Sequence, residues 1–289
     1  MADKKTKVLV LGASGMLGNA VLRLFARSAG YEAVGSIRSA SALRLLPEDL
    51  RERVICGVDV EQFDGLAGLL STERPDVVIN CIGLVKQLTA ADDPLVAIPI
   101  NALLPHRLAR LCALTGARLV HMSTDCVFDG TRGMYSEAHT PDAKDLYGLS
   151  KYLGEVDCAH AITLRTSIIG HELSGAHSLV GWFLAQQGRV KGFRRAIFSG
   201  LPTVELARVI RDYVLPHAEL HGVYHVSTAP INKFDLLTLI AKVYGKTIDI
   251  APDDGFAIDR SLDSSRFRQA TCYQPQPWPE LVSRMREFG

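Results

Sequence analysis

The segment KVLVLGASGMLG, residues 7–18, carries the strongest indication of a fold in this chain. Its apolar run, typical of a buried strand, ends at Gly12, and a helix-like pattern follows at residues 16–29. The glycines at 12, 15 and 18 allow a tight turn, a close approach of the backbone to a pyrophosphate, and close packing of helix on strand. The segment therefore predicts the start of a dinucleotide-binding βαβ unit, although its spacing is GxxGxxG and not GxGxxG.

Further continuous apolar runs predict the other strands of a sheet. They occupy residues 31–36, 53–60, 76–83, 118–124 and 161–170. Helix-like patterns lie between several of them, and one ends at Gly116, as a helix capped by a left-handed glycine does. Continuous apolar strands alternating with helices indicate a parallel sheet covered on both faces. We therefore predict an α/β fold, with a doubly wound parallel sheet (Rossmann domain) over residues 1–170.

The second half of the chain is less regular. Helix-like patterns occur at residues 204–215, 233–245 and 279–288, and a strand-like run at 222–227. We predict that residues 171–289 form a smaller C-terminal α/β lobe that binds the substrate. No linker separates the two parts, so we expect that the chain can cross between them more than once.

The composition narrows the classes of partner. The formal net charge is +1 and 22% of residues are charged, so no nucleic-acid or membrane partner is predicted. The apolar runs are too short for a signal peptide or a membrane span, and the six cysteines are scattered without a CxxC pair. We expect a cytoplasmic protein with reduced thiols. The histidines at 217, 221 and 225 would not share a helix face, so no metal site is predicted. The sequence leaves the oligomeric state open, and a homo-oligomer is one possibility.

The glycine-rich segment and the second predicted strand indicate which dinucleotide binds. The candidate contacts in the segment are Gly12, Ser14, Gly15, Met16, Leu17 and Gly18. NAD-binding units place an acidic residue at the end of the second strand, to hold the ribose 2′-hydroxyl. Here that place is taken by Arg38, whose guanidinium suits a 2′-phosphate. NADP(H) is therefore favoured, with a solvated surface arginine as the alternative.

A tyrosine and a lysine stand four residues apart in DLYGLSKYLGE, residues 145–155. On a helix, Tyr147 and Lys151 share a face, so their polar ends can converge on one site. The pair alone does not distinguish a catalytic site from two amphipathic surface side chains. Thr124 ends a predicted strand, at the edge where open α/β sheets bind ligands. Together with the predicted phosphate loop, this favours catalysis.

These motifs resemble the extended short-chain dehydrogenase/reductases. The resemblance rests on GASGMLG (12–18), VDV (58–60), NCIG (80–83), STD (123–125) and YGLSK (147–151), and it covers essentially the whole chain. Within that superfamily, HMSTDCVFDG (121–130), LRTSIIG (164–170) and DRSLDSSRFR (259–268) are most similar to nucleotide-sugar reductases of the dTDP-4-dehydrorhamnose reductase type.

The resemblance implies roles for individual residues. Asp59 and Val60 would flank the adenine, and Cys81, Ile82 and Gly83 would line the cofactor cleft. Thr124, Tyr147 and Lys151 would form the catalytic set, with Tyr147 and Lys151 also contacting the cofactor. The implied reaction is the NADPH-dependent reduction of a nucleotide-linked 4-keto-6-deoxy sugar, in deoxysugar and surface polysaccharide biosynthesis.

Elementary chemistry agrees with a proton donor at Tyr147. A free tyrosine has a pKa of about 10, and an ammonium one helical turn away would favour the phenolate and lower that pKa. We therefore predict that Lys151 lowers the pKa of Tyr147, which protonates the ketone oxygen as hydride arrives. Thr124 would polarise and orient the carbonyl.

Departures from the superfamily's pattern leave two alternatives. Related dehydratases have an Asp–Glu pair after the threonine, but here Asp125 is followed by Cys126, so dehydration is not predicted. Cys126 and His177 resemble the proton-exchanging pair of GDP-fucose synthase, so a bifunctional epimerase/reductase is one alternative. The other is a non-catalytic NADP-binding subunit, like the regulatory subunit of methionine adenosyltransferase. Arg260 is a candidate ligand of the substrate's diphosphate.

Overall fold

The central element is a parallel sheet. The computed structural model describes residues 4–84 and 89–289. In these ranges the largest sheet has seven strands in the order β10-β6-β5-β4-β1-β2-β3, and every neighbouring pair is parallel. Its strands are β1 (Thr6–Leu11), β2 (Tyr31–Ile37), β3 (Val54–Cys56), β4 (Val77–Asn80), β5 (Arg118–Thr124), β6 (Ala161–Thr166) and β10 (Gly222–His225). The Rossmann-type α/β fold predicted from the sequence is confirmed.

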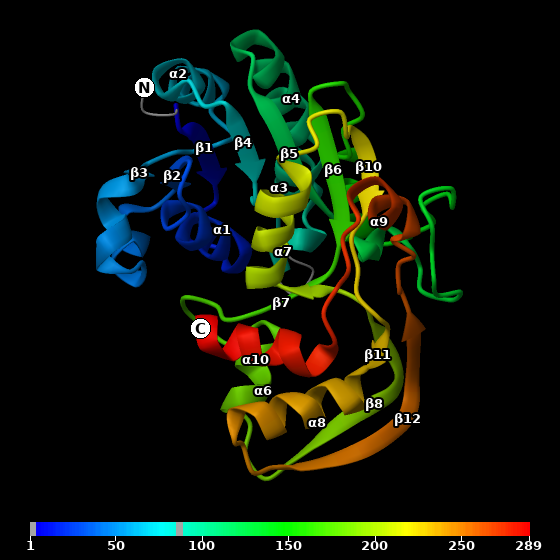
Figure 1. Ribbon diagram of the computed structural model, residues 1–289. Coiled ribbons are helices and arrows are strands. Elements are labelled where there is room, and N and C mark those ends of the chain that lie inside the picture. The colour runs from blue at the N-terminus through cyan, green and yellow to red at the C-terminus, as the bar shows by residue number, and fades with distance from the viewer. Residues whose placement is uncertain (1–3, 85–88) are drawn as a thin grey trace.

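The strand order reverses beside β1. The chain runs from β1 to β2 and β3 on one side, and then continues through β4, β5 and β6 on the other. The crevice outside the carboxyl ends of β1 and β4 is therefore a topological switch point, where open α/β sheets bind ligands. These ends point toward the smaller lobe (Figure 1).

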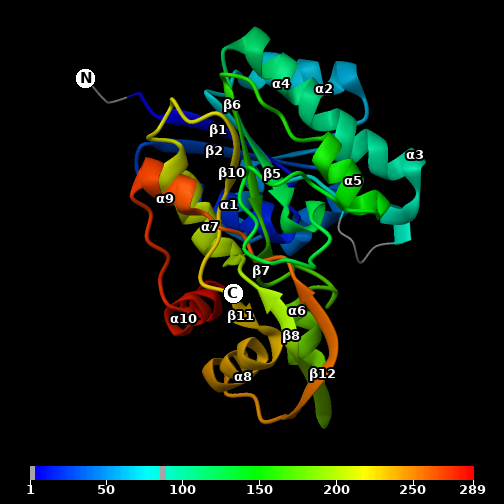
Figure 2. The same ribbon diagram turned by 90° about the vertical axis from the view of Figure 1, so that its right-hand side faces the viewer.

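Helices cover both faces of the sheet. One face carries α1 (Met16–Ala26) and α7 (Thr203–Val209), and the other carries α2 (Phe63–Glu73), α4 (Leu104–Thr115) and α5 (Leu146–Leu153) (Figure 2). Side chains alternate along β1, so Val8 and Val10 join the first apolar cluster while Leu9 and Leu11 join the second. A strand buried on both faces must be apolar throughout, which explains the continuous runs in the sequence.

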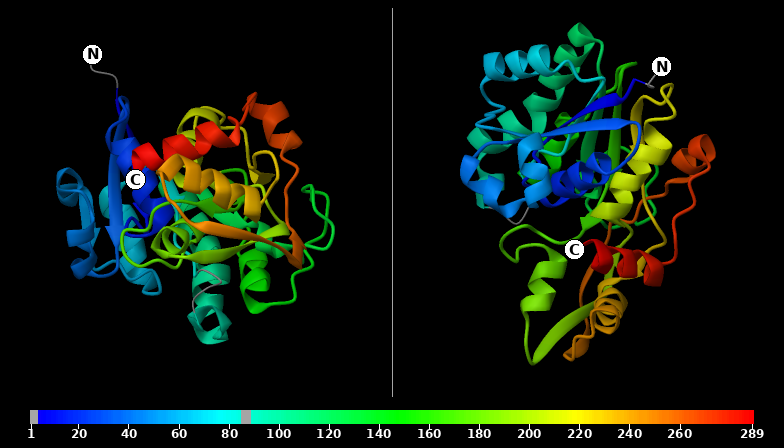
Figure 3. Two further views of the ribbon diagram at one scale, coloured as in Figure 1. Left: turned by 90° about the horizontal axis from the view of Figure 1, so that it is seen from below. Right: turned by 60° about the vertical axis from the view of Figure 1, so that its left-hand side comes forward.

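The smaller lobe is built on a second sheet. Its strand order is β11-β8-β12, with β8 (Arg189–Phe198), β11 (Ile231–Asn232) and β12 (Asp249–Asp259), and α8 (Lys233–Tyr244) packs against β8. The long β8–β12 pair extends away from the main sheet (Figures 1 and 3). The sequence patterns did not predict β8 and β12. Both are half-exposed, and β12 carries an irregularity between Asp253 and Ala257, so neither forms a continuous apolar run.

The remaining elements are short connections and C-terminal helices. They are α3 (Pro94–Ala97), α6 (Leu179–Ala185), α9 (Ser265–Thr271), α10 (Trp278–Phe288), β7 (Ile168–Ile169) and β9 (Leu201–Pro202). Short 3-10 segments are η1 (Ala40–Leu45), η2 (Glu48–Arg53), η3 (Thr89–Asp92) and η5 (Asp125–Val127), while η4 (Ile98–Leu103) and η6 (Ile210–Val214) are π-helical. In the described part of the chain, none of the helices is long and apolar enough to cross a membrane.

The chain crosses between the two parts. After β8, helix α7 packs on α1 and strand β10 pairs with β6, so residues 203–225 belong to the Rossmann sheet and its cover. The chain then returns to the smaller lobe through β11 and α8. Division at residue 170 therefore separates the lobes only approximately.

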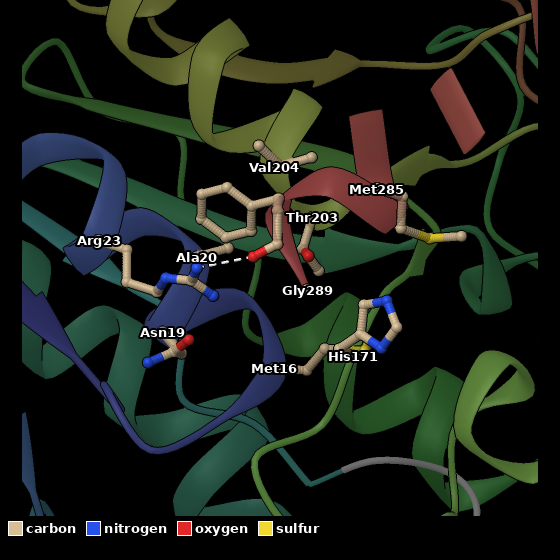
Figure 4. A pocket seen from close by; sticks show the side chains of 10 residues that line it. Met16, Asn19, Ala20, Arg23, His171, Thr203, Val204, Met285 and Gly289 are labelled. Atoms are coloured by element: carbon tan, nitrogen blue, oxygen red, sulfur yellow. Dashed lines mark hydrogen bonds between the residues drawn. The ribbon is translucent and has the colours of Figure 1, made fainter. Parts of the chain in front are cut away.

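Helix α10 packs on α7 and α8, and its last residues contact α1 through Arg23. Arg23 donates from Nη2 to the carbonyl oxygen of Phe288 at 2.7 Å, beside a cavity of about 20 Å³ (Figure 4). Among the described residues, Asn19 Nδ2 and Arg23 Nε are buried there without a hydrogen-bond partner. A cavity of this size has room for a water molecule and not for a sugar. The candidate active site is elsewhere.

Candidate active site

The loop between β1 and α1 has the backbone geometry that a phosphate cradle requires. Gly12 has φ +83°, and a side chain at Gly18 would overlap the Gly12 carbonyl, so the helix starts close against the strand. Gly15 is exposed, and its amide donates to the Gly12 carbonyl oxygen at 2.9 Å. The first amides of α1 therefore face the switch-point crevice, as pyrophosphate binding requires. Leu17 is buried and Ser14 and Met16 are partly exposed, so Leu17 serves the core through its side chain.

The other predicted cofactor residues follow the carboxyl ends of neighbouring strands. Arg38 comes directly after β2 and is exposed. Asp59 and the buried Val60 lie beyond β3, and Asp59 accepts a hydrogen bond from Glu61 N at 3.1 Å. Residues 81–83 follow β4, where Ile82 N donates to Asn80 Oδ1 at 3.1 Å. The arrangement fits a dinucleotide that extends across the switch point.

Helix α5 is positioned by its first turn. Asp145 caps it by accepting a hydrogen bond from Gly148 N at 2.9 Å. A side chain at Gly148 would overlap the Cys126 carbonyl oxygen, so α5 packs directly against the turn that follows Thr124. Tyr147 and Thr124 thereby come into side-chain hydrogen-bond contact. The Thr124 hydroxyl also accepts from Cys126 N at 3.2 Å.

Lys151 lies one turn further along α5 and is 5% exposed. Its Nζ donates to the carbonyl oxygen of Met122 at 2.7 Å, and a side chain at Gly83 would lie 3.6 Å from it. Burial lowers the pKa of Lys151 to about 8, and the charge of Glu155 opposes that shift. The amine therefore lies between the end of β5 and the segment that follows β4.

The pKa of Tyr147 corrects a prediction. Burial raises it above its ordinary value, the charges of Cys126 and Asp125 add to the rise, and the Thr124 hydrogen bond opposes it. The prediction that Tyr147 has a pKa below its ordinary value is wrong for this structure, because burial dominates. The Lys151 ammonium donates its hydrogen bond to Met122. Tyr147 therefore holds its proton at neutral pH.

Two basic side chains, Arg260 and Lys233, lie beside the turn that follows Thr124. We call these two side chains the cationic wall and the turn, residues 125–127, the catalytic turn. Arg260 donates from Nε to the Phe128 carbonyl oxygen at 2.7 Å, and its Nη1 lies 3.8 Å from Cys126 Sγ. Lys233, the first residue of α8, interacts electrostatically with Asp125 and Cys126. Burial raises the pKa of Asp125, and the charges of Arg260 and Lys233 oppose that rise.

Sequence reasoning placed Arg260 in the site but missed Lys233. Asn232 caps α8 through a hydrogen bond from Asp235 N, so the helix start was readable from the sequence. That this start faces the catalytic turn was not readable, because it depends on how β11 pairs with β8. The third candidate for substrate binding, His177, is exposed on the segment between β7 and α6.

A π-helical turn supports the lysine side of the cleft. Asn101, in η4, accepts from Leu84 N at 3.0 Å and donates to Ser150 Oγ at 3.2 Å. Such turns often occur at functional sites, because they redirect a side chain. In the residues that the structure describes, no cluster of three or more His, Cys, Asp or Glu side chains could hold a metal ion.

The fold and this site together define an extended short-chain dehydrogenase/reductase. The model of the family described as "RmlD substrate binding domain" matches residues 6–285, and the chain belongs to that family. The resemblance stated from the sequence motifs is thereby confirmed.

Similar proteins include reductases and a subunit of methionine adenosyltransferase. A probable low-salt glycan biosynthesis reductase of Haloferax volcanii is 33% identical over 178 residues, covering 60% of this chain and 57% of that protein. The methionine adenosyltransferase 2 subunit beta of Danio rerio is 27% identical over 82% of this chain and 74% of its own. The match spans about half the length of the first curated relatives.

A solved structure shows the same fold. The dTDP-4-dehydrorhamnose reductase of Bacillus anthracis, crystallised with NADP, aligns with a TM-score of 0.79 over 98% of this chain and 99% of its own, at 24% identity.

Proposed function

We propose that this protein is an NADPH-dependent reductase of a nucleotide-linked 4-keto-6-deoxy sugar. The proposal rests on one observation above the others. The β5 end and the first turns of α5 bring Thr124, Tyr147 and Lys151 together beside the phosphate cradle. The product would be a deoxyhexose precursor for surface polysaccharide, made in the cytoplasm. None of the six cysteines, which all lie in the described ranges, forms a disulfide, as a reducing compartment would keep them.

NADPH would supply the hydride to the C4 carbon of the sugar. The residues that would hold it are those of the cradle (12, 14–18), Arg38 at the 2′-phosphate, Asp59 and Val60 at the adenine, and residues 81–83 along the cleft. The relative crystallised with NADP supports this choice. Arg38 supports it independently, since an acidic residue at this place would select NAD.

Tyr147 would be the proton donor. Its raised pKa keeps the phenol protonated until negative charge develops on the ketone oxygen, and the proton then moves to that oxygen. Thr124 would hold the same oxygen through its hydroxyl. Lys151 would bind ribose hydroxyls of the cofactor and favour the phenolate that remains after proton transfer.

The cationic wall would bind the charged part of the substrate. Arg260 and Lys233 face the catalytic turn. A nucleotide sugar carries its diphosphate next to the sugar, so these two cations would bind that diphosphate. Cys126, where dehydratases have a glutamate, would contact the sugar without removing a carbon-bound proton. His177 is a weaker candidate for substrate contact because it is exposed.

The test is NADPH oxidation with UDP-, dTDP- and GDP-linked 4-keto-6-deoxy sugars. We expect turnover with at least one of them and product analysis that shows reduction at C4. Because a methionine adenosyltransferase subunit is among the relatives, the absence of turnover is also informative. NADPH binding without turnover on any of these sugars would replace the proposal with a non-catalytic role.

A further inference from the structure

A buried ion pair lies beneath the catalytic helix. Arg165, on β6, donates to Glu155 from Nε at 2.7 Å and from Nη2 at 2.6 Å, and both side chains are 5% exposed. Charges buried to this degree are tolerated only when they are paired and hydrogen-bonded. Neither residue belongs to the catalytic or binding set described above, so the pair has a separate role.

The pair is part of a row of polar residues across the sheet. Ser123, Arg165 and His225 are in register on β5, β6 and β10, and all three are buried. Ser123 Oγ donates to Glu155 Oε1 at 2.7 Å. The carboxylate thus accepts from two neighbouring strands at once, while it belongs to the segment that ends α5.

The position of Glu155 links it to Lys151 from two directions. It follows Lys151 by four residues, just beyond the C-cap at Gly154. Its partner Ser123 is the residue after Met122, whose carbonyl oxygen accepts the hydrogen bond from Lys151 Nζ. One carboxylate therefore holds both the helix that carries the lysine and the strand that the lysine contacts.

We infer that Glu155 is a positioning residue, which acts on the reaction by holding Lys151 at the cleft as a charged ammonium. The inference rests on the proposed function, which assigns Lys151 to the cofactor and to Tyr147. Among the titratable groups around Lys151, burial keeps His121 neutral, because its pKa is well below its ordinary value. Tyr147 holds its proton, and Arg165 is bound by the carboxylate itself. The negative charge that favours the ammonium comes from Glu155.

The hydrogen bonds of Arg165 decide which variant can test the role of Glu155. Arg165 Nη1 donates to His225 Nε2 at 3.2 Å, and His225 Nδ1 in turn donates to the Tyr135 carbonyl oxygen at 2.9 Å. Glu155→Gln alone leaves Arg165 charged and unbalanced, so it lowers Tm by roughly 10 °C. Glu155→Gln/Arg165→Gln removes both charges and lets the two amides bond each other, and is the variant to use. Ser123→Ala is the matched control, because it removes a hydrogen bond to Glu155 and keeps its charge.

The first measurement uses the protein without dinucleotide. The unfolding free energy is measured against pH for the unmodified protein, the double variant and Ser123→Ala, each with and without Lys151→Met. The difference that Lys151→Met makes at each pH reports the proton held by Lys151. Removing the carboxylate should move the midpoint of this difference about one pH unit below that of the unmodified chain. Ser123→Ala should leave it in place. An unmoved midpoint in the double variant would make Glu155 a structural residue and overturn the inference.

The second measurement concerns the cofactor and separates the two proposals. An ammonium at Lys151 disfavours the cationic nicotinamide of NADP⁺, so the ratio of the Kd for NADP⁺ to the Kd for NADPH should fall as pH rises through the Lys151 pKa. In the double variant this fall should begin about one unit lower. If neither dinucleotide binds the unmodified protein, the proposed function fails, while the first measurement still decides the role of Glu155. An identical ratio profile in both proteins would count against Glu155.

Discussion

Lys151 Nζ donates a hydrogen bond to the Met122 carbonyl oxygen at 2.7 Å, four residues along α5 from Tyr147. The lysine is thus anchored to the strand that ends in Thr124. Burial, and not this ammonium, has the largest effect on the pKa of Tyr147. The protein without ligand is therefore arranged to keep a proton on Tyr147, which is the state that ketone reduction requires.

Replacing the proton donor should stop the reaction and leave the fold intact. Tyr147→Phe removes the phenol hydroxyl, so kcat should fall by about 10²–10⁴-fold, the usual contribution of a general acid. NADPH affinity, measured by fluorescence titration, should change little, because most of the proposed cofactor contacts are elsewhere. Near-normal turnover in this variant would remove Tyr147 from the catalytic set.

Cofactor choice should depend on one exposed side chain. Arg38→Ala should weaken NADPH by roughly tenfold, because charge-assisted hydrogen bonds contribute about 1.5–3 kcal/mol. NADH affinity should be unchanged, because NADH lacks the 2′-phosphate. Calorimetric titration of both dinucleotides checks this, and equal weakening of the two would show that Arg38 acts on the fold.

The buried lysine should make stability depend on pH. The folded chain releases the Lys151 proton near pH 8, whereas the unfolded chain holds it until about pH 10.4. The unfolded state therefore binds more protons in that window, and the unfolding free energy should rise with pH there, on the order of 3 kcal/mol from this group. Urea unfolding of the unmodified protein and Lys151→Met should diverge between these pH values. Parallel curves would mean that the lysine is not desolvated.

Substrate affinity should depend on the cationic wall. Arg260→Lys keeps the charge but loses the planar donor pair, so KM for the nucleotide sugar should rise about tenfold while kcat and NADPH affinity change little. Arg194→Lys is the matched control, because Arg194 on β8 is exposed and paired with Asp254 on β12. Equal effects of the two changes on KM would show that Arg260 does not bind the diphosphate.

Isotope exchange should distinguish a pure reductase from an epimerase. Product made in deuterated water should carry no deuterium at the carbons next to the former ketone, because no base is assigned to remove a proton there. Mass spectrometry of the product measures this directly. Deuterium uptake that disappears in Cys126→Ser would establish the epimerase alternative, with Cys126 as one of its proton-transfer groups.

The sequence by itself determined the fold class and most strands of the Rossmann sheet. Period and capping are local properties, so a helix was predicted at residues 233–245, where α8 covers Lys233–Tyr244, and a strand at 118–124, which is β5. Gly116 and Gly245 end α4 and α8 in the left-handed conformation, where other residues are strained. The predicted run at 53–60 is a strand only at Val54–Cys56, because an apolar run does not specify where pairing ends.

Only the tertiary structure decided how the two sides of the cleft meet. Lys151 and Met122 are 29 residues apart, and Arg260 and Cys126 are 134 apart, so no local pattern encodes either contact. Arg260 directly follows β12, and both β12 and its partner β8 are half-exposed and lack the apolar periodicity that would have revealed them. Burial, and with it the pKa values of Tyr147 and Lys151, depends on which elements cover a side chain. That covering is set by strand order and lobe packing, which are properties of the whole chain.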